Sequence, residues 1–260
     1  MSLDTPKVMG ILNVTPDSFY PGARSPREEI IRKNVEKMIE EGVDIIDVGG
    51  CSTRPGFSAP SIELERERVE MGCRIVRELC PDMPLSVDTF RASIASSAID
   101  EWGADIINDV SGGADPAMWG LIASRKVAYV LTHNRKDGSL DYEDVTANVI
   151  TEFAKSIDSL HSLGVNDVII DPGFGFAKTT DQNFRLFSQL NEVVRMGYPV
   201  LVGISRKSMI CNTLGCKPEE ALAGTVAVDA LALEKGVHIL RVHDVKEAAE
   251  TVKLYARLNQ

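Results

Sequence analysis

Short apolar runs alternate along this chain with longer stretches in which apolar residues recur at helical spacing. The runs are nearly continuous rather than alternating between apolar and polar residues, which is typical of parallel strands buried on both faces. They predict eight strands, at residues 8–13, 43–48, 84–88, 105–110, 127–132, 167–171, 199–204 and 237–242. A strand followed by a helix, repeated in this way, indicates a parallel sheet with helices packed on it.

The stretches between the strands carry the signals of helix ends. Ser25, Pro26 and Glu28 fit the N-cap, N1 and N3 positions of a helix start, and Gly42 fits the end of that helix. Further helices are predicted at 62–80, 92–102, 116–125, 142–163, 181–196 and 218–235, with a last one after Asp244.

The number of strand–helix units favours a closed barrel. Eight units in 260 residues is about 32 residues each, as expected for an α/β fold of the (β/α)8 TIM-barrel type. The alternative is an open doubly wound sheet, which would need a glycine-rich dinucleotide-binding turn after the first strand. Residues 13–19 read Asn-Val-Thr-Pro-Asp-Ser-Phe instead. Because the chain shows no linker or low-complexity stretch, we expect residues 1–260 to form a single domain.

Composition and charge narrow the classes of partner. The 28 Lys and Arg residues against 38 Asp and Glu residues give a net charge of −10, which argues against nucleic-acid binding through a basic face. No apolar run approaches the length of a membrane span, and residues 1–7 lack the pattern of a signal peptide. The five cysteines contain no C-x-x-C pair, so free thiols and a cytoplasmic location are expected.

Polar residues follow nearly every predicted strand. In barrels of this kind, chemistry collects at the carboxyl ends of the strands. The polar residues at these ends are Asn13, Asp47, Asp88, Asn108, Asp109, His133, Asp171, Ser205, Arg206, Lys207, Arg241 and His243. Taken alone, Asp47 fits the holding of a neighbouring loop equally well, and His133 fits a hydrogen-bonded core histidine equally well. The ring as a whole indicates a binding site for a polar ligand.

Two basic clusters stand out in this acidic chain. One is Ser205-Arg206-Lys207-Ser208 after the seventh strand, and the other is Arg241-Val242-His243-Asp244 after the eighth. The loops after these two strands often bind phosphate in such barrels. His243 directly precedes a predicted helix start, where free N–H groups favour an anion. The sequence therefore predicts a phosphate or pyrophosphate site.

Two long loops, 14–25 and 49–61, are rich in glycine, proline and polar residues. This composition fits lids that close over a substrate, and it also fits ordinary surface loops. Arg54 is the only charged residue of the second loop and favours the first interpretation.

Eight motifs, in order along nearly the whole chain, resemble those of the dihydropteroate synthase family. They are Gly10-Ile-Leu-Asn-Val-Thr-Pro-Asp-Ser-Phe19, Asp47-Val-Gly-Gly50, Ser52-Thr-Arg-Pro-Gly56, Ser86-Val-Asp-Thr89, Asn108-Asp-Val-Ser-Gly112, Asp171-Pro-Gly-Phe-Gly-Phe176, Gly203-Ile-Ser-Arg-Lys-Ser208 and Arg241-Val-His-Asp244. The resemblance implies a TIM-barrel enzyme that joins 6-hydroxymethyl-7,8-dihydropterin diphosphate to p-aminobenzoate. Pyrophosphate and 7,8-dihydropteroate, a folate precursor, would be the products. It also implies Mg²⁺ as cofactor, a homodimer and competition by sulfonamides.

The resemblance assigns roles to residues of this chain. Asp88, Asn108, Asp171 and Lys207 would hold the pterin, and Asn13, Arg241 and His243 would hold the pyrophosphate. Asn13 would also be the ligand of Mg²⁺. The p-aminobenzoate and the lid region would be lined by Thr53, Arg54, Pro55, Phe176 and Ser205.

The expected mechanism is dissociative: pyrophosphate leaves, and the amine attacks a cationic pterin methylene. Asp88, Lys207, Arg241 and His243 are the predicted catalytic residues. Lys207 would bind substrate rather than form a Schiff base.

Three positions depart from the pattern of the family. Pro21 lies in the first loop where many members have Ser-Asp-Gly-Gly, Cys51 stands where Glu is frequent, and Asn134 stands where a methionine that packs on the pterin is expected. One alternative is a pterin-dependent methyltransferase, which needs no pyrophosphate site. The other is a non-catalytic pterin-binding paralogue, which only the altered first loop supports. The two basic clusters favour the synthase.

Overall fold

The computed structural model describes residues 2–14, 26–51, 59–135 and 137–258. Eight strands form one sheet in which every pairing is parallel and the order is β6-β5-β4-β3-β2-β1-β8-β7. The strands are β1 (Lys7–Asn13), β2 (Ile45–Gly49), β3 (Leu85–Asp88), β4 (Ile106–Asp109), β5 (Ala128–Thr132), β6 (Val168–Asp171), β7 (Leu201–Val202) and β8 (Ile239–Val242).

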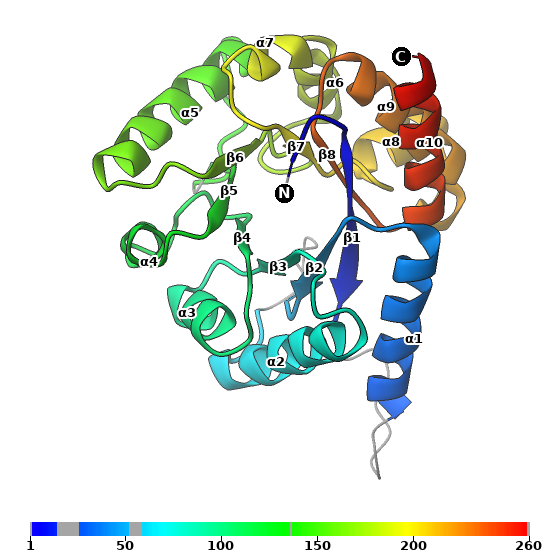
Figure 1. Cartoon of the computed structure of the whole chain (residues 1–260). Helices are drawn as coiled ribbons and strands as arrows, with labels where there is room; N and C mark the ends of the chain where they lie inside the picture. The colour runs from blue at the N-terminus through cyan, green and yellow to red at the C-terminus, as the bar shows by residue number, and fades with distance from the viewer. Residues whose placement is uncertain (1, 15–25, 52–58, 136, 259–260) are drawn as a thin grey trace.

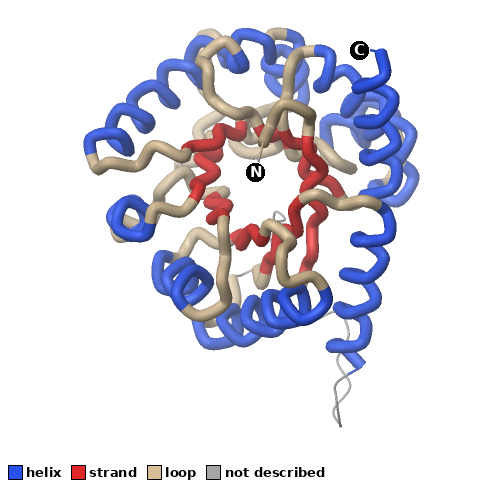
Figure 2. Tube along the Cα trace, in the orientation of Figure 1, coloured by secondary structure: helices blue, strands red, loops and turns tan. Residues whose placement is uncertain are grey.

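The two edges of this sheet meet and close the barrel. A parallel bridge joins Ile170 of β6 to Val200, just before β7, and the N–H of Ile170 donates to the carbonyl of Pro199 at 2.9 Å. Figures 1 and 2 show the resulting ring of strands with the helices around its outside. The closed (β/α)8 barrel expected from the sequence is therefore confirmed, and the open doubly wound sheet is excluded.

Helices follow the strands in the expected order, with differences at their ends. The helices are α1 (Pro26–Glu41), α2 (Ile62–Leu79), α3 (Ala92–Asp100), α4 (Met118–Arg125), α5 (Val145–Ser162), α6 (Thr180–Ser188), α7 (Leu190–Val194), α8 (Ser208–Leu214), α9 (Leu222–Glu234) and α10 (Val245–Leu258), with a 3-10 turn η1 (Pro218–Glu220) before α9. The expected helix at 142–163 begins only at Val145, because the Asp144 carboxylate caps the N–H groups of Thr146 and Ala147.

Two other helices differ from the prediction. The expected helix 181–196 is broken at Gln189, whose backbone is not helical, into α6 and α7. The expected helix 218–235 is divided into η1 and α9. The sequence did not predict α8, which is too short for its apolar spacing to stand out from the loop.

An apolar layer closes the lower end of the barrel. Its seven buried members come from seven strands: Met9, Ile45, Ile106, Val130, Ile169, Leu201 and Ile239. Leu3 packs against the outer side of this layer, and in Figure 1 the N-terminal segment crosses the centre of the ring on the side facing the viewer. A second and larger core fills the space between the strands and the helices. We call the seven-residue layer the floor of the barrel.

The polar residues sit directly above the floor because of strand geometry. Alternate residues of a strand point to the same face, so the residue two positions after a floor residue also points inward. This relation gives Asp47 after Ile45, Asn108 after Ile106, Asp171 after Ile169 and Arg241 after Ile239. The strands therefore place a polar layer at their carboxyl ends, which we call the mouth of the barrel.

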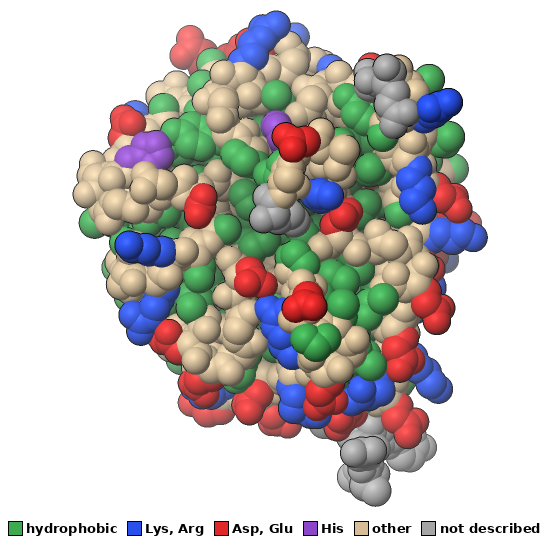
Figure 3. Space-filling view, viewed as in Figure 1, with side chains coloured by type: hydrophobic (Ala, Val, Ile, Leu, Met, Phe, Trp, Pro, Cys, Tyr) green, Lys and Arg blue, Asp and Glu red, His purple; other side chains and the backbone are tan. Residues whose placement is uncertain are grey.

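The face shown in Figure 3 carries charges of both signs. Lys and Arg side chains are interspersed there with Asp and Glu, and hydrophobic side chains lie toward the centre. This mixture differs from the single basic face that nucleic-acid binding requires. Among the helices of the described residues, none combines the length and the apolar character needed to span a bilayer.

Candidate active site

Three strands contribute to a charged cluster around the guanidinium of Arg241 on β8. The Nε of Arg241 donates to Oδ2 of Asp47 on β2 at 2.7 Å, and its Nη2 donates to Oδ2 of Asp88 on β3 at 2.6 Å. Both carboxylates are buried. Burial lowers the pKa of Arg241, but the charges of Asp47 and Asp88 raise it by more, so the net shift is upward. The guanidinium therefore remains charged at the centre of the mouth.

Asp47 is the hub of this cluster. Its Oδ1 accepts a hydrogen bond from Oγ of Ser86 at 2.6 Å, and its Oδ2 accepts from Nδ2 of Asn108 at 3.0 Å as well as from Arg241. The sequence left open whether Asp47 merely holds a loop. In the structure it lies inside the barrel and orients both Asn108 and Arg241.

Asn108 offers an acceptor to a ligand. Its Nδ2 is occupied by Asp47, whereas no donor among the described residues reaches its buried Oδ1. A buried amide oxygen without a donor costs free energy, and a ligand N–H placed against it would remove that cost. Asn108 is therefore prepared to bind a hydrogen-bond donor.

The carboxyl group of Asp88 has a pKa close to neutral pH. Burial and the negative charges of Asp47, Asp109 and Glu65 together raise its pKa to about 7, against the opposing charge of Arg241. Its protonation therefore responds to any ligand that changes the charge near Arg241.

Asp171 and Lys207 add two further ionisable groups to the mouth. Asp171 ends β6 and accepts the N–H of Gly173 on Oδ1 at 2.8 Å, while burial raises its pKa. Burial and the charge of Arg241 lower the pKa of Lys207, and Asp171 and Asp88 raise it. The ammonium of Lys207 lies 4.4 Å from the ring centroid of Phe176. These charges interact with Arg241, so Asp171, Lys207 and Arg241 occupy the same mouth.

Ser205 and His243 meet beside the eighth strand. Oγ of Ser205 lies 3.1 Å from Nδ1 of His243 and accepts the backbone N–H of His243 at 3.2 Å. His243 is exposed and stands just before α10, whose first N–H groups attract negative charge. This arrangement suits the binding of an anion.

Arg206 does not belong to the mouth, although the sequence grouped it with Lys207. Its backbone has φ +55°, in the left-handed region, which directs its side chain away from its neighbours. The guanidinium binds both carboxylate oxygens of Asp244 at 2.8 Å and the carbonyl oxygens of Pro218 and Glu219. It joins the start of α10 to η1 and is a structural residue.

Comparisons with known proteins agree with this geometry. A family model described as "Pterin binding enzyme" matches residues 9–243. The dihydropteroate synthase of Bacillus subtilis (strain 168) is 42% identical over 258 residues, which cover 97% of this chain and 89% of that protein.

The chain belongs to the pterin-binding enzyme family.

Solved structures of dihydropteroate synthases in this family share the fold. The Xanthomonas albilineans enzyme with 4-aminobenzoic acid is similar with a TM-score of 0.93 and 37% identity, covering 100% of this chain and 95% of that one. The same enzyme in complex with 7,8-dihydropteroate is similar with a TM-score of 0.89 and 35% identity, with the same coverage.

Asn13 lies at the end of β1, as the sequence predicted. A Cβ built on Gly49 would be 3.8 Å from Oδ1 of Asn13 and 3.9 Å from Oδ2 of Asp88, so both oxygens border one point of the mouth. Thr53, Arg54 and Pro55 lie outside the described residues, as do Pro21 and most of the loops 14–25 and 49–61. Within the described part of the chain, no three His, Cys, Asp or Glu side chains gather as a metal site.

Two of the unusual positions of this family member have defined surroundings. Nδ2 of Asn134 donates to the carbonyl of Val110 at 2.9 Å, so it ties the end of β5 to the end of β4. Cys51 is buried, and burial together with the charge of Glu65 raises its pKa. It is therefore an inert thiol rather than a nucleophile.

Sequence reasoning missed Lys178, which is buried behind the turn that carries Asp171 and Phe176. Its partners are mostly backbone carbonyl groups, which no side-chain pattern marks. His133, for which the sequence left two interpretations open, is one of these partners and is a hydrogen-bonded core residue.

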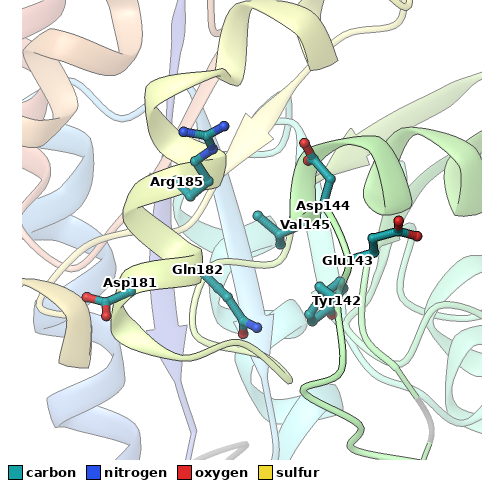
Figure 4. A pocket seen from close by; sticks show the side chains of 7 residues that line it. All are labelled: Tyr142, Glu143, Asp144, Val145, Asp181, Gln182 and Arg185. Carbon is teal, nitrogen blue, oxygen red and sulfur yellow. The ribbon is translucent and has the colours of Figure 1, made fainter.

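A surface hollow of about 370 Å³ lies beside this region, between the starts of α5 and α6 (Figure 4). Tyr142 lines the hollow, and its hydroxyl donates to the carbonyl of Ala177 at 3.0 Å. None of the residues that line the hollow belongs to the charged cluster around Arg241.

Proposed function

We propose that this chain catalyses the condensation of 6-hydroxymethyl-7,8-dihydropterin diphosphate with p-aminobenzoate to 7,8-dihydropteroate and pyrophosphate, a step of folate biosynthesis. One observation carries the proposal. A single mouth contains a buried carboxylate, Asp171, and a buried amide, Asn108, beside an anion-binding edge with Arg241 and His243. A ligand with a donor-rich heterocycle and a diphosphate satisfies both sets of groups.

The heterocycle binds over the floor. Oδ1 of Asn108 and the Oδ2 of Asp171 accept N–H groups of the aminopyrimidine edge, because both point into the interior and Oδ1 of Asp171 is already used by Gly173. Lys207 donates to an acceptor of the ring from its position over Phe176. Buried partners of this kind reject a ring that lacks the matching donors.

The diphosphate binds at Arg241 and His243. Nε and Nη2 of Arg241 are held by Asp47 and Asp88, whereas its Nη1 donates to none of the described residues. That N–H group and the start of α10 face the anion. The C–O bond breaks with its electron pair on the departing pyrophosphate, and Arg241 and His243 stabilise the charge that develops there.

The amine then completes the reaction. Its lone pair forms the new C–N bond to the pterin methylene, and one N–H proton is lost to solvent or pyrophosphate. Asp88, in its ionised form, stabilises the cationic methylene before attack. Phe176 and Ser205 line the p-aminobenzoate side.

Mg²⁺ fits the oxygen of Asn13, which lies near Oδ2 of Asp88 at the end of the barrel. Mg²⁺ prefers oxygen ligands and commonly keeps waters and substrate phosphates as its other ligands, so one protein oxygen can suffice. Bound there, it supplies positive charge to the departing diphosphate.

A homodimer is supported by α9. This helix is apolar nearly all round, with exposed Leu231 on its outer side, and it packs against α10, where Leu254 is also exposed. A helix that is apolar all round is normally covered. All five cysteines are free thiols, which supports a reducing, cytoplasmic location.

The test is pyrophosphate release from the pterin diphosphate with and without p-aminobenzoate, with dihydropteroate followed by mass. Release that requires both substrates supports the synthase. Binding of the pterin diphosphate without release would indicate a non-catalytic paralogue, and methyl transfer from a methylated pterin would indicate a methyltransferase. Competition by a sulfonamide against p-aminobenzoate is expected of the synthase.

A further inference from the structure

Lys178 sits in a cage of backbone oxygens behind the mouth. Its Nζ lies 3.1 Å from the carbonyl oxygens of Gly173 and Phe176 and 3.3 Å from that of His133. It also lies 2.9 Å from Nδ1 of His133. An ammonium has three N–H donors and no acceptor, so this cage satisfies it fully. Lys178 thereby ties the turn after β6 to the end of β5.

His133 is held for this contact from its other side. Because the ammonium only donates, Nδ1 of His133 accepts, and Nε2–H donates to Oε2 of Glu152 at 2.9 Å. Burial and the charge of Lys178 lower the pKa of His133 to about 4, which keeps the ring neutral. Arg135 binds the other oxygen of Glu152 at 2.7 Å. The result is a continuous line from Arg135 through Glu152 and His133 to Lys178.

Charges from several elements face Lys178. Burial lowers its pKa to about 7; Asp171 and Glu152 raise the pKa, and Arg135 and Lys207 lower it. A lysine of ordinary pKa is charged throughout the working range, whereas this one depends on the negative charge of Asp171 and Glu152 to remain so.

The turn held by Lys178 carries groups of the mouth. Gly173 has φ +70°, and a Cβ there would clash with the carbonyl oxygen of His133, so the turn and the end of β5 pack too closely for any side chain at this position. The N–H of Gly173 binds Asp171, and the ring of Phe176 lies under Lys207. Any movement of the turn therefore displaces Asp171 and Phe176 together.

We propose that Lys178 is a positioning residue of the pterin site, fixed by the His133–Glu152 pair, which holds the 172–177 turn so that Asp171 and Phe176 meet the heterocycle. The proposal rests on the proposed function for its substrate. It concerns neither a new reacting group nor a contact between Lys178 and the ligand.

The direct test is Lys178→Met, which keeps the length of the side chain and removes the ammonium. We expect the KM for the pterin diphosphate to rise about tenfold, the effect of losing hydrogen bonds from one charged group, with kcat changed less than about threefold. The matched control is Lys235→Met. Lys235 also donates to a carbonyl, that of Ser188 at 3.0 Å, and lies near a phenylalanine ring, but it follows the end of α9.

A second variant covers the case in which Lys178→Met does not fold. Glu152→Gln changes a half-exposed group that touches neither the turn nor the mouth, and we expect the same rise in KM at about threefold. A role in stability alone would lower the Tm of both variants and leave the KM of each folded variant within about twofold of the unchanged protein, and that result would overturn the proposal.

Binding of 6-hydroxymethylpterin, followed by its fluorescence, separates this proposal from the proposed function. If the unchanged protein releases no pyrophosphate, the proposed function fails. The affinity for the pterin then still tests Lys178: weakening in Lys178→Met but not in Lys235→Met supports the positioning role, and equal affinity in all three proteins rejects it.

Discussion

Arg241 and Asp47 are 194 positions apart in the chain, yet the Nε of Arg241 lies 2.7 Å from Oδ2 of Asp47 in the interior of the barrel. The two side chains project inward from the first and last thirds of the fold. Because both are largely shielded from water, each one depends on the other for its compensating charge.

Asp47→Asn is expected to destabilise the fold by roughly 3–5 kcal/mol, because it leaves the charge of Arg241 buried and only partly compensated. Urea unfolding measures this loss. The control is Asp100→Asn, which removes an equally short ion pair, 2.7 Å to Arg125, on the surface. Solvent screens a half-exposed pair of that kind, so its loss should cost far less than the loss of the buried pair. Equal losses in the two variants would contradict the role of Asp47 as hub.

Arg241→Gln and Arg206→Gln should distinguish the roles of two arginines, one on β8 and one after β7. We expect Arg241→Gln to lower kcat by about a hundredfold or more, since it removes charge from the departing diphosphate. Arg206→Gln should lower the Tm through its lost contacts with Asp244 and η1 but leave both KM values nearly unchanged. Steady-state kinetics beside thermal unfolding give both readouts. A raised KM for the pterin diphosphate in Arg206→Gln would place that arginine in the mouth after all.

Lys207→Met should weaken binding of the pterin by about tenfold, because its ammonium is the donor above Phe176. The exposed Lys217→Met serves as control. Fluorescence titration with 6-hydroxymethylpterin reports both. Unaltered binding together with normal turnover in Lys207→Met would remove this residue from the site.

Asp229→Val is expected to stabilise the protein in a pH-dependent way. Asp229 is buried on α9, its Oδ1 meets no donor among the described residues, and burial raises its pKa from 3.8 to about 7. Between these pH values the folded state keeps a proton that the unfolded state loses. The free-energy cost of burying Asp229 is therefore absent below pH 3.8, grows as the pH rises and is complete above about 7. That cost is on the order of 4 kcal/mol.

The measurement is the free energy of unfolding of both proteins at pH 4.5 and pH 8. The gain of Asp229→Val should be several times larger at pH 8. A gain that is the same at both values would mean that Asp229 does not titrate as its burial requires.

Asn13→Ala is expected to raise the Mg²⁺ concentration that gives half of the maximal rate by about tenfold, because it removes a protein oxygen from the metal. Excess chelator should abolish turnover of both proteins. Asn212→Ala, which changes an exposed asparagine on α8, is the control. The same Mg²⁺ requirement in all three proteins would exclude Asn13 as a ligand.

The barrel was predictable because its signals are local and repeated. Each strand is an apolar run, and four of the inward polar residues follow a floor residue by two positions, as Arg241 follows Ile239. The break at Gln189 and the short helix α8 were not predictable. The helices α7 and α8 have only one or two turns, and helices so short are stabilised by tertiary packing rather than by a local sequence signal.

The sequence predicted which side chains lie at the mouth of the barrel, but not which of them contact one another. Asp88, Asn108, Asp171 and Arg241 stand at strand ends, where the motifs and the barrel geometry both point. The hub role of Asp47 depends on partners from three other strands, and the separation of Arg206 from Lys207 depends on one left-handed backbone angle. Lys178 left no signal, since its cage consists mainly of main-chain oxygens.

The floor of the barrel also dictates an order of events. Seven packed apolar side chains seal one end, so both substrates and both products must use the other. A heterocycle held by Asn108 and Asp171 rests on that seal, underneath whatever occupies the rim at Phe176 and Ser205. If the pterin binds there as proposed, it must enter before p-aminobenzoate, and dihydropteroate must leave through the same open end before the next cycle begins.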